Sequence, residues 1–336
     1  MRVQVVRTAP TVVSMFAGCG GSSLGYRMAG YRELLAVEWD PVATASFREN
    51  FPGIPVHEGD IAELSGGECL RLAGIAPGEL DVLDGSPPCQ GFSTAGKRRL
   101  KDPRNTLFRE FARLLGELKP KAFVMENVSG LVKGYMKQVY LEAVKSLREC
   151  GYRAKGEVMN AAHFGVPQRR ERVIVVGVRE DLGMDPSHPK PCLKGKTFRE
   201  ACIDLRGNSP DDRMLPGWLR ELGKTQPNQW TTELEGYKRV KGTVNGAIST
   251  RWAGWNRVCG TITRSEIAWC GIIHPDRERY LSLAEAKRLT GFPDDFKLPV
   301  RKLGIGLVGN SVPPPLMRAI ALHVREEILS VPGRTV

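Results

Sequence analysis

Short apolar runs alternate with longer amphipathic stretches through the first half of the chain. The apolar runs predict buried strands at residues 11–16, 34–37, 81–84, 122–125 and 172–178. The amphipathic stretches predict helices through Tyr26 and Met28 and over residues 41–50, 105–118 and 140–150. Strands and helices that alternate at this spacing indicate an α/β fold with a doubly wound, mostly parallel sheet.

The alternation is lost at about residue 186, where prolines, glycines and charged residues become scattered. We therefore expect one domain over 1–185 plus 305–336 and a smaller, irregular domain over 186–304, with 275–304 as a hinge. A single domain that carries a long insertion is the alternative. Near the C-terminus the glycines of 306–312 predict a loop, and Pro313 opens an amphipathic helix that runs to about residue 329.

Composition and charge narrow the possible classes of protein. The chain has 336 residues, 41% of them apolar, which is enough to bury a large core. Its net charge of +12 suggests a polyanionic partner such as nucleic acid, although binding to a ribosome or a membrane surface would give the same balance. The apolar runs are far shorter than the roughly 18–20 residues that a membrane span needs. Residues 1–10 carry no apolar secretion signal, and none of the eight cysteines forms a Cys-x-x-Cys pair. We expect a cytoplasmic protein with free thiols and no bound metal.

Polar residues of interest gather where the predicted strands end, which is the edge at which parallel sheets bind ligands. Phe16-Ala-Gly-Cys-Gly-Gly21 joins a strand to a helix, so its glycines would let backbone N–H groups approach a ligand. Glu38 ends the next strand and suits ribose hydroxyls, while Trp39 could stack on a base and Asp60 could accept from an exocyclic amine. These residues favour an adenosine-containing ligand. Ser23 stands at the third glycine position of a dinucleotide motif, which weakens that interpretation, and a purely structural glycine turn is the alternative.

Cys89 is the candidate nucleophile. It follows two prolines that fix the backbone just beyond the strand at 81–84. A basic run comes next in the chain, namely Lys97, Arg98, Arg99, Lys101 and Arg104. Nearby positive charge raises the fraction of reactive thiolate. A buried cysteine in a rigid turn beside a solvated basic loop is the alternative.

Glu126 and a group of polar residues before the last strand complete the candidate site. Burial at the end of the strand 122–125 could keep Glu126 protonated and let it donate a proton. Strand alternation places Gln168, Arg170 and Arg172 on one face. Two guanidinium groups on one face suit a carboxylate, a phosphate or a base carbonyl. Taken one at a time, each of these motifs is explained about equally well by a purely structural role and by a functional one.

Taken together and in order, the segments resemble the cytosine-C5 DNA methyltransferases of bacteria and phages, either in restriction-modification systems or as solitary enzymes. The resemblance covers residues 12–178 and about 261–325. The matching motifs are Phe16-x-Gly-x-Gly20-Gly21, Glu38-Trp39, Gly59-Asp60-Ile61, Ser86-Pro-Pro-Cys-Gln90, Arg104-Asn-Thr-Leu107, Glu126-Asn-Val128, Gln168-x-Arg-x-Arg172, Leu289-Thr-Gly-Phe-Pro-Asp294 and Gly309-Asn-Ser-Val-Pro313. The resemblance implies a Rossmann-like methyltransferase fold, with 186–304 as a target-recognition domain.

The same resemblance implies a mechanism and a cofactor. Cys89 would attack C6 of a flipped-out cytosine, Glu126 would contact N3 and N4, and Arg172, helped by Arg170, would orient Glu126 and the cytosine O2. The methyl group would come from S-adenosylmethionine, with no metal ion. The residues implied to hold this cofactor are Phe16, Gly18, Gly20, Leu24, Glu38, Trp39, Asp60, Ile61, Pro87, Leu107, Asn310 and Val312.

The implied partner is double-stranded DNA, with a restriction endonuclease acting separately, and we expect a monomer. The candidate DNA contacts are Gln90, Ser93, Lys97, Arg98, Arg99, Arg104, Gln168, Arg239, Lys241 and Arg251. Two other interpretations remain open. One is the tRNA-methylating branch of the family, whose Cys-Phe-Thr signature is not found in the recognition region, and the other is a catalytically silent DNA-binding homologue.

Overall fold

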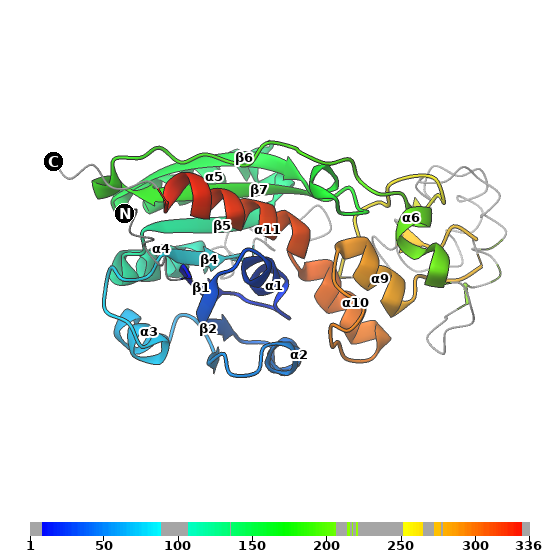
Figure 1. Cartoon of the computed structure of the whole chain (residues 1–336), viewed down its shortest axis with the longest axis horizontal. Helices are drawn as coiled ribbons and strands as arrows, with labels where there is room; N and C mark the ends of the chain where they lie inside the picture. The colour runs from blue at the N-terminus through cyan, green and yellow to red at the C-terminus, as the bar shows by residue number, and fades with distance from the viewer. Residues whose placement is uncertain are drawn as a thin grey trace, which may run out of the picture.

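A seven-stranded sheet forms the centre of the molecule (Figure 1). The computed structural model describes residues 9–88, 107–134, 136–205, 214–215, 217, 220, 251–264, 272–276 and 278–330. The strand order is β3-β2-β1-β4-β5-β7-β6, in which the first five are parallel and β7 is antiparallel to both of its neighbours. The strands are β1 (Thr11–Met15), β2 (Arg32–Glu38), β3 (Val56–Glu58), β4 (Val82–Gly85), β5 (Ala122–Val128), β6 (Tyr152–Asn160) and β7 (Glu171–Arg179).

Helices cover both faces of this sheet, because its strands carry apolar side chains on both sides. Val13 and Met15 of β1 point into a core shared with α3 (Gly66–Ala73), α4 (Leu107–Leu118) and α5 (Met136–Glu149). Val12, one residue along the strand, points into the opposite core, which α1 (Gly21–Met28) and α11 (Pro314–His323) complete. A π-helical turn at Val324–Ile328 continues α11.

The helix ends follow from local sequence. Asp40 caps α2 (Pro41–Asn50), its Oδ1 accepting from the N–H of Val42 at 2.9 Å, and Pro41 occupies the first turn. Ser282 and Glu285 form a capping box that starts α9 (Leu283–Thr290), and Gly291 ends that helix in the left-handed conformation.

The C-terminal elements pack beside the edge of the sheet where β1 and β2 end (Figure 1). A third core joins Phe47 of α2 to Leu289 of α9, Val308 of α10 (Arg301–Asn310) and Phe198 of α6 (Phe198–Cys202). A two-stranded ribbon, β8 (Arg251–Trp252) with β9 (Ile272–Ile273), lies nearby and buries Trp252 completely. This core crosses the predicted boundary near residue 186, and the division into two domains and the hinge at 275–304 stay predictions.

The predicted fold class is confirmed, and the five predicted strands are present. The elements β3, α3 and β6 were not predicted, and neither were α6, β8, β9 and α9 in the irregular region. The loop predicted at 306–312 is wrong over most of its length, because α10 continues to Asn310. Its glycines serve close packing, since a Cβ on Gly309 would lie 2.3 Å from the carbonyl carbon of Thr263. Among the described residues, no helix has the length and apolar character needed to cross a membrane.

Candidate active site

The loop after β1 brings backbone N–H groups to the carboxyl edge of the sheet. Phe16, Gly18 and Gly20 all have positive φ angles, of 56°, 57° and 97°. Gly20 is the N-cap of α1, and a Cβ there would lie 2.3 Å from the Phe51 ring, so the turn requires glycine. The first turn of α1 therefore presents unpaired N–H groups beside an open loop, an arrangement that suits a polar ligand.

Glu38, the last residue of β2, is anchored against this loop. Its Oε2 accepts from the N–H of Gly18 at 2.7 Å, and its Oε1 accepts from the N–H groups of Trp39 and Asp40 at 3.0 and 2.9 Å. Burial raises the pKa of Glu38 above its ordinary value, although these three N–H groups favour the ionised form. Its oxygens keep lone pairs for further donors such as hydroxyl groups. The neighbouring Trp39 is 72% exposed, so its ring is free to meet a flat ligand.

The C-terminal loop meets the glycine loop although almost 300 residues separate them. A Cβ on Gly21 would lie 2.5 Å from the carbonyl oxygen of Val312, and Cys19 Sγ lies 3.2 Å from Ser311 Oγ. The predicted residues Asn310 and Val312 are therefore next to the predicted residues Gly18 and Gly20.

The other predicted cofactor residues occupy neighbouring positions. Asp60 is exposed just beyond β3, and its Oδ1 accepts from the N–H of Ala62 at 2.9 Å. Ile61 is buried in the core against which Phe16 and Leu107 pack. Pro87 is buried after β4, and Leu24 is buried in α1. All twelve predicted cofactor residues lie in the described part of the chain, and their contact with a cofactor stays a prediction.

Glu126 of β5 and Arg172 of β7 form a largely buried ion pair. Arg172 Nε lies 2.7 Å from Glu126 Oε1, and the two side chains are 13% and 9% exposed. The antiparallel register explains the contact, because Val128 faces Arg172 and Glu126 faces Ile174, so the pair lies on one diagonal of the ladder. A second Arg172 nitrogen, Nη1, donates to the Glu171 carbonyl at 2.7 Å, which fixes the guanidinium. The pair leaves one edge of the carboxyl group for another donor or acceptor.

Asn127 connects this pair to the loop that follows β4. Its buried Nδ2 donates to the carbonyl of Pro87 at 2.9 Å, and its Oδ1 accepts from the N–H of Val128 at 2.9 Å. The loop that leads to Cys89 is thereby tied to the strand that carries Glu126. Asn127 was not predicted as a site residue, although it lies within the motif Glu126-Asn-Val128.

Gln168 and Arg170 are both buried, and both contact Ile262, which is remote in sequence. The Gln168 side chain is fully buried, donating to the Thr290 hydroxyl and accepting from the N–H of Ile262, both at 3.1 Å. The predicted DNA contact by Gln168 is therefore wrong, because no part of the side chain faces solvent. Arg170 is 1% exposed and donates to two backbone carbonyls, and its predicted help to Arg172 stays a prediction.

Several predicted site residues lie outside the described residues. They are Cys89, Gln90, Ser93, Lys97, Arg98, Arg99, Arg104, Arg239 and Lys241. Arg251 pairs through its backbone with Ile272 in the β8–β9 ribbon, and its side chain is outside the description. Within the described ranges, no group of three or more His, Cys, Asp or Glu side chains is arranged to hold a metal ion.

The comparisons with known proteins agree with this geometry. The sequence profile of the family described as C-5 cytosine-specific DNA methylase matches residues 10–326. The chain belongs to this methylase family. It is 33% identical to the type II methyltransferase M.XorII of Xanthomonas oryzae, over 97% of this chain and 87% of that one. It is 40% identical to the type II methyltransferase M.DdeI of Desulfomicrobium norvegicum, over 93% and 88% of the two chains.

The fold also matches solved structures. A candidate DNA modification methyltransferase encoded within an E. coli prophage superimposes with a TM-score of 0.73 and 26% identity, over 94% of this chain and 99% of that one. The predicted family, fold class and enzyme class are confirmed by these findings.

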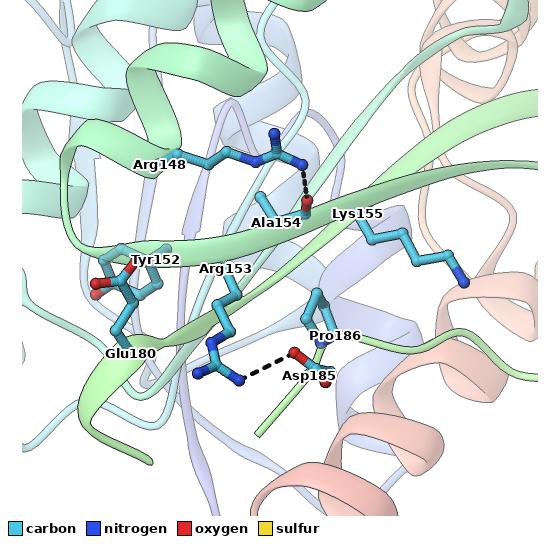
Figure 2. Close-up of a pocket in the computed structure, with 8 residues that line it drawn as sticks. All are labelled: Arg148, Tyr152, Arg153, Ala154, Lys155, Glu180, Asp185 and Pro186. Carbon is cyan, nitrogen blue, oxygen red and sulfur yellow. Dashed lines mark hydrogen bonds and ion pairs between the residues drawn. The ribbon is translucent and has the colours of Figure 1, made fainter. Parts of the chain in front are cut away.

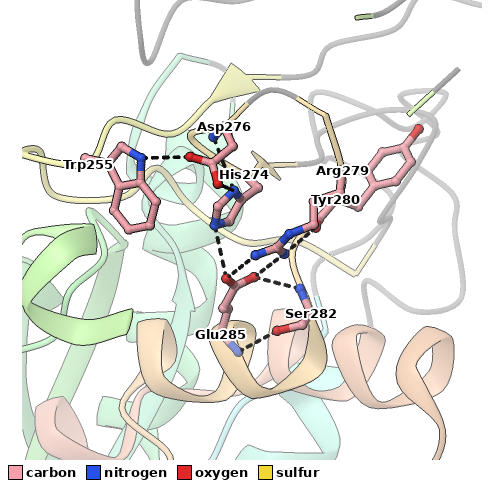
Figure 3. A network of polar contacts seen from close by, with 7 residues as sticks. All are labelled: Trp255, His274, Asp276, Arg279, Tyr280, Ser282 and Glu285. Atoms are coloured by element: carbon pink, nitrogen blue, oxygen red, sulfur yellow. Dashed lines mark hydrogen bonds and ion pairs between the residues drawn. The ribbon is translucent and has the colours of Figure 1, made fainter. Parts of the chain in front are cut away.

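A buried polar network at the start of α9 was also missed from the sequence (Figure 3). Glu285 of this methylase is 1% exposed, and both of its oxygens lie 2.9 Å from guanidinium nitrogens of Arg279. Its Oε1 also lies 3.2 Å from His274 Nε2, and its Oε2 accepts from the N–H of Ser282 at 2.8 Å. Asp276, which accepts from the indole N–H of Trp255 at 3.0 Å, lies on the other side of the His274 ring. The only signal in the sequence was the Ser-x-x-Glu capping pattern at 282–285.

A pocket of about 430 Å³ is lined by residues from the end of α5, the first half of β6 and the segment 180–186 (Figure 2). Arg148, Arg153 and Lys155 give it a basic lining, and Tyr152 and Pro186 add apolar surface. Arg153 already pairs with Asp185 at 3.0 Å, and Arg148 donates to the Ala154 carbonyl at 2.8 Å. The pocket contains no residue of the candidate active site, so we assign the chemistry to the sheet edge instead.

Proposed function

We propose that the protein transfers a methyl group from S-adenosylmethionine to C5 of a cytosine flipped out of duplex DNA. The observation that carries the proposal is the Glu126–Arg172 pair, held at 2.7 Å on the same sheet edge as the glycine loop. The Asn127–Pro87 contact adds the loop that leads to Cys89. The net charge of +12 supports a polyanionic substrate.

The residues at the glycine loop fit S-adenosylmethionine. Gly18 and Gly20 leave the backbone open, Glu38 is oriented to accept from ribose hydroxyls, and the exposed Trp39 offers a face for adenine. Asp60 and the loop at 310–312 lie at the same edge and would hold the remaining groups. When bound, this cofactor supplies an electrophilic methyl group.

The protein's own residues then divide the work at the cytosine. The Cys89 thiolate attacks C6 and forms a C–S bond, while the electron pair of the C5–C6 double bond moves to C5. Glu126 contacts N3 and N4, and Arg172 holds the orientation of Glu126 and meets O2. After C5 has gained the methyl group, its proton passes to a water molecule, the C5–H electron pair forms the C5–C6 double bond, and the C6–S electron pair returns to Cys89. The ring recovers its double bond, and the thiolate is released.

The reacting carbons are stacked inside duplex DNA, so the base must leave the helix. Flipping costs a few kcal/mol, which contacts to the base and the phosphates offset. We assign the phosphate contacts to Lys97, Arg98, Arg99 and Arg104 and the reading of sequence to 186–304, including Arg239, Lys241 and Arg251. Since M.XorII and M.DdeI are named type II methyltransferases, we infer a short recognition site and an endonuclease that acts separately.

The test is methylation of duplex DNA with S-adenosylmethionine, followed by bisulfite conversion and sequencing. We expect protected cytosines within one short motif and none with Cys89→Ser. Cys192→Ser is the matched control, since Cys192 is exposed and lies outside the site, and it should methylate normally. Methylation of tRNA but not of duplex DNA would assign the protein to the RNA branch. Tight DNA binding without methylation of either substrate would overturn the enzymatic proposal.

A further inference from the structure

Arg170 occupies a junction of three chain segments behind the candidate catalytic pair. Its Nη1 donates to the Ile262 carbonyl at 2.9 Å, and its Nη2 donates to the Gly309 carbonyl at 2.8 Å. Arg172, two residues further along the chain, pairs with Glu126. One side chain therefore links the start of β7 to the segment at 259–264 and to the end of α10.

The two carbonyls belong to segments with different tasks in the proposed function. Ile262 lies within the predicted recognition region 186–304, and Thr261 Oγ1 next to it donates to the Arg169 carbonyl at 2.6 Å. Gly309 directly precedes Asn310 and Val312 of the predicted cofactor loop. The segments are in close contact, because a Cβ on Gly309 would lie 2.3 Å from the Thr263 backbone.

The chemistry of the junction requires an arginine. Arg170 is 1% exposed, and no carboxylate among the described residues lies within ion-pair distance of it. Burying a guanidinium without a charged partner is costly, so the two carbonyl contacts must offset a large desolvation penalty. A planar guanidinium can donate to two carbonyls in fixed directions at once, whereas a lysine ammonium is a point charge on a flexible stem.

We propose that Arg170 is a positioning residue that sets the DNA-side segment 261–264 and the cofactor-side loop 310–312 relative to the Glu126–Arg172 pair. This inference rests on the proposed function for the identity of the two ligands. It predicts that one substitution at Arg170 weakens both binding sites together, although the side chain touches neither ligand.

The experiment compares Arg170→Met, Arg170→Lys and Arg148→Lys in the full-length protein. Arg148 is the matched control, since it also donates to a backbone carbonyl, that of Ala154, but lies in the remote pocket (Figure 2). Binding of S-adenosylhomocysteine is measured by calorimetry, binding of duplex DNA by fluorescence anisotropy, and kcat and both KM values by methyl transfer. All measurements are made well below the unfolding temperature of each variant.

For Arg170→Met we expect at least about a tenfold loss of affinity for each ligand, because two charge-assisted hydrogen bonds are removed. Arg170→Lys should lie between Arg170→Met and the wild type, and Arg148→Lys should match the wild type. A lower unfolding temperature with unchanged binding constants would show a purely structural role and overturn the proposal. A change in only one of the two affinities would overturn it as well. If the wild type binds both ligands but methylates nothing, the proposed function is wrong. The two binding measurements then still test the role of Arg170.

Discussion

Replacing Glu285 by glutamine should destabilise the protein strongly, although residue 285 is outside the candidate active site. The substitution keeps the shape of the side chain and removes its negative charge. Arg279, which contacts both Glu285 oxygens at 2.9 Å, and His274 would then lose their buried partner (Figure 3). Breaking a buried pair by removing one member costs about 3–5 kcal/mol.

The pKa of Glu285 independently indicates how much its charge contributes to the free energy of unfolding. Burial alone would raise it, but hydrogen bonds from His274 and Arg279, the charge of His274 and the N–H of Ser282 together lower it from 4.5 to about 2. At about 1.4 kcal/mol for each pKa unit, this lowering corresponds to about 3 kcal/mol. Because the folded-state pKa is the lower one, this stabilisation is fully present above pH 4.5 and is lost as the pH falls toward 2.

Urea unfolding of the wild type and Glu285→Gln tests both points. At pH 7 the free energies of unfolding should differ by about 3 kcal/mol, and at about pH 3.5 the difference should be smaller by about 1 kcal/mol. Glu68→Gln is the matched control, since Glu68 also contacts an arginine, Arg71, but lies on the surface, and it should unfold like the wild type. A difference below about 0.5 kcal/mol at pH 7 would refute the assigned role of the network, as only surface substitutions are that mild. A difference that does not change with pH would show that the carboxylate charge is not the stabilising feature.

Three further substitutions probe the site and the fold. Glu126→Gln should lower the rate constant of single-turnover methylation by about 100-fold or more, because the carboxyl group that contacts N3 of the cytosine is lost. Binding of S-adenosylhomocysteine should stay unchanged. Glu38→Ala should weaken that binding by about tenfold in calorimetry, because a charged hydrogen-bond acceptor is removed, while DNA affinity stays the same. Gly25→Ala should lower stability by about 1–3 kcal/mol in thermal unfolding, because its Cβ would lie 2.6 Å from Met317 Cβ where α1 crosses α11. Gly67→Ala, whose Cβ meets nothing within 4 Å, should leave stability unchanged or raise it.

The central strands and the motif residues were predictable because their signals are local. Parallel strands buried on both faces appear as continuous apolar runs, which is how β1, β4 and β5 were found. The edge strand β6 was missed because its exposed face carries polar residues such as Arg153 and Lys155, although alternation with Tyr152 and Ala154 was visible in the sequence. The strand β3 has only three residues, too few for a periodic pattern.

The roles of Gln168 and Arg170 were not predictable from periodicity. Alternation shows which side chains share a face, but not what covers that face. Here the covering groups are Ile262 and Gly309, 92 and 139 residues further along the chain from Arg170. The same limit explains why α10 was predicted as a loop at 306–312. Glycines usually indicate a loop, and the sequence does not show that Gly309 packs closely against Thr263.

Backbone contacts between residues 198–199 and 255–257 hold together the chain on the two sides of residues 206–250, which belong to the proposed recognition region. On one side of this segment α6 begins at Phe198, whose N–H donates to the Arg257 carbonyl at 2.9 Å, and the N–H of Arg199 donates to the Trp255 carbonyl at 2.8 Å. The parts of the chain on the two sides of residues 206–250 are therefore held next to each other by backbone hydrogen bonds. Further contacts from Arg170 and from the Glu285 network hold the returning chain to the sheet and to α9. Under the proposed function, we expect substitutions in this segment to alter the surface offered to DNA, while the β5–β7 ladder keeps Glu126 and Arg172 together. We therefore expect sequence specificity to change without loss of catalysis in such variants, and we expect Arg170 to be the residue that couples the two.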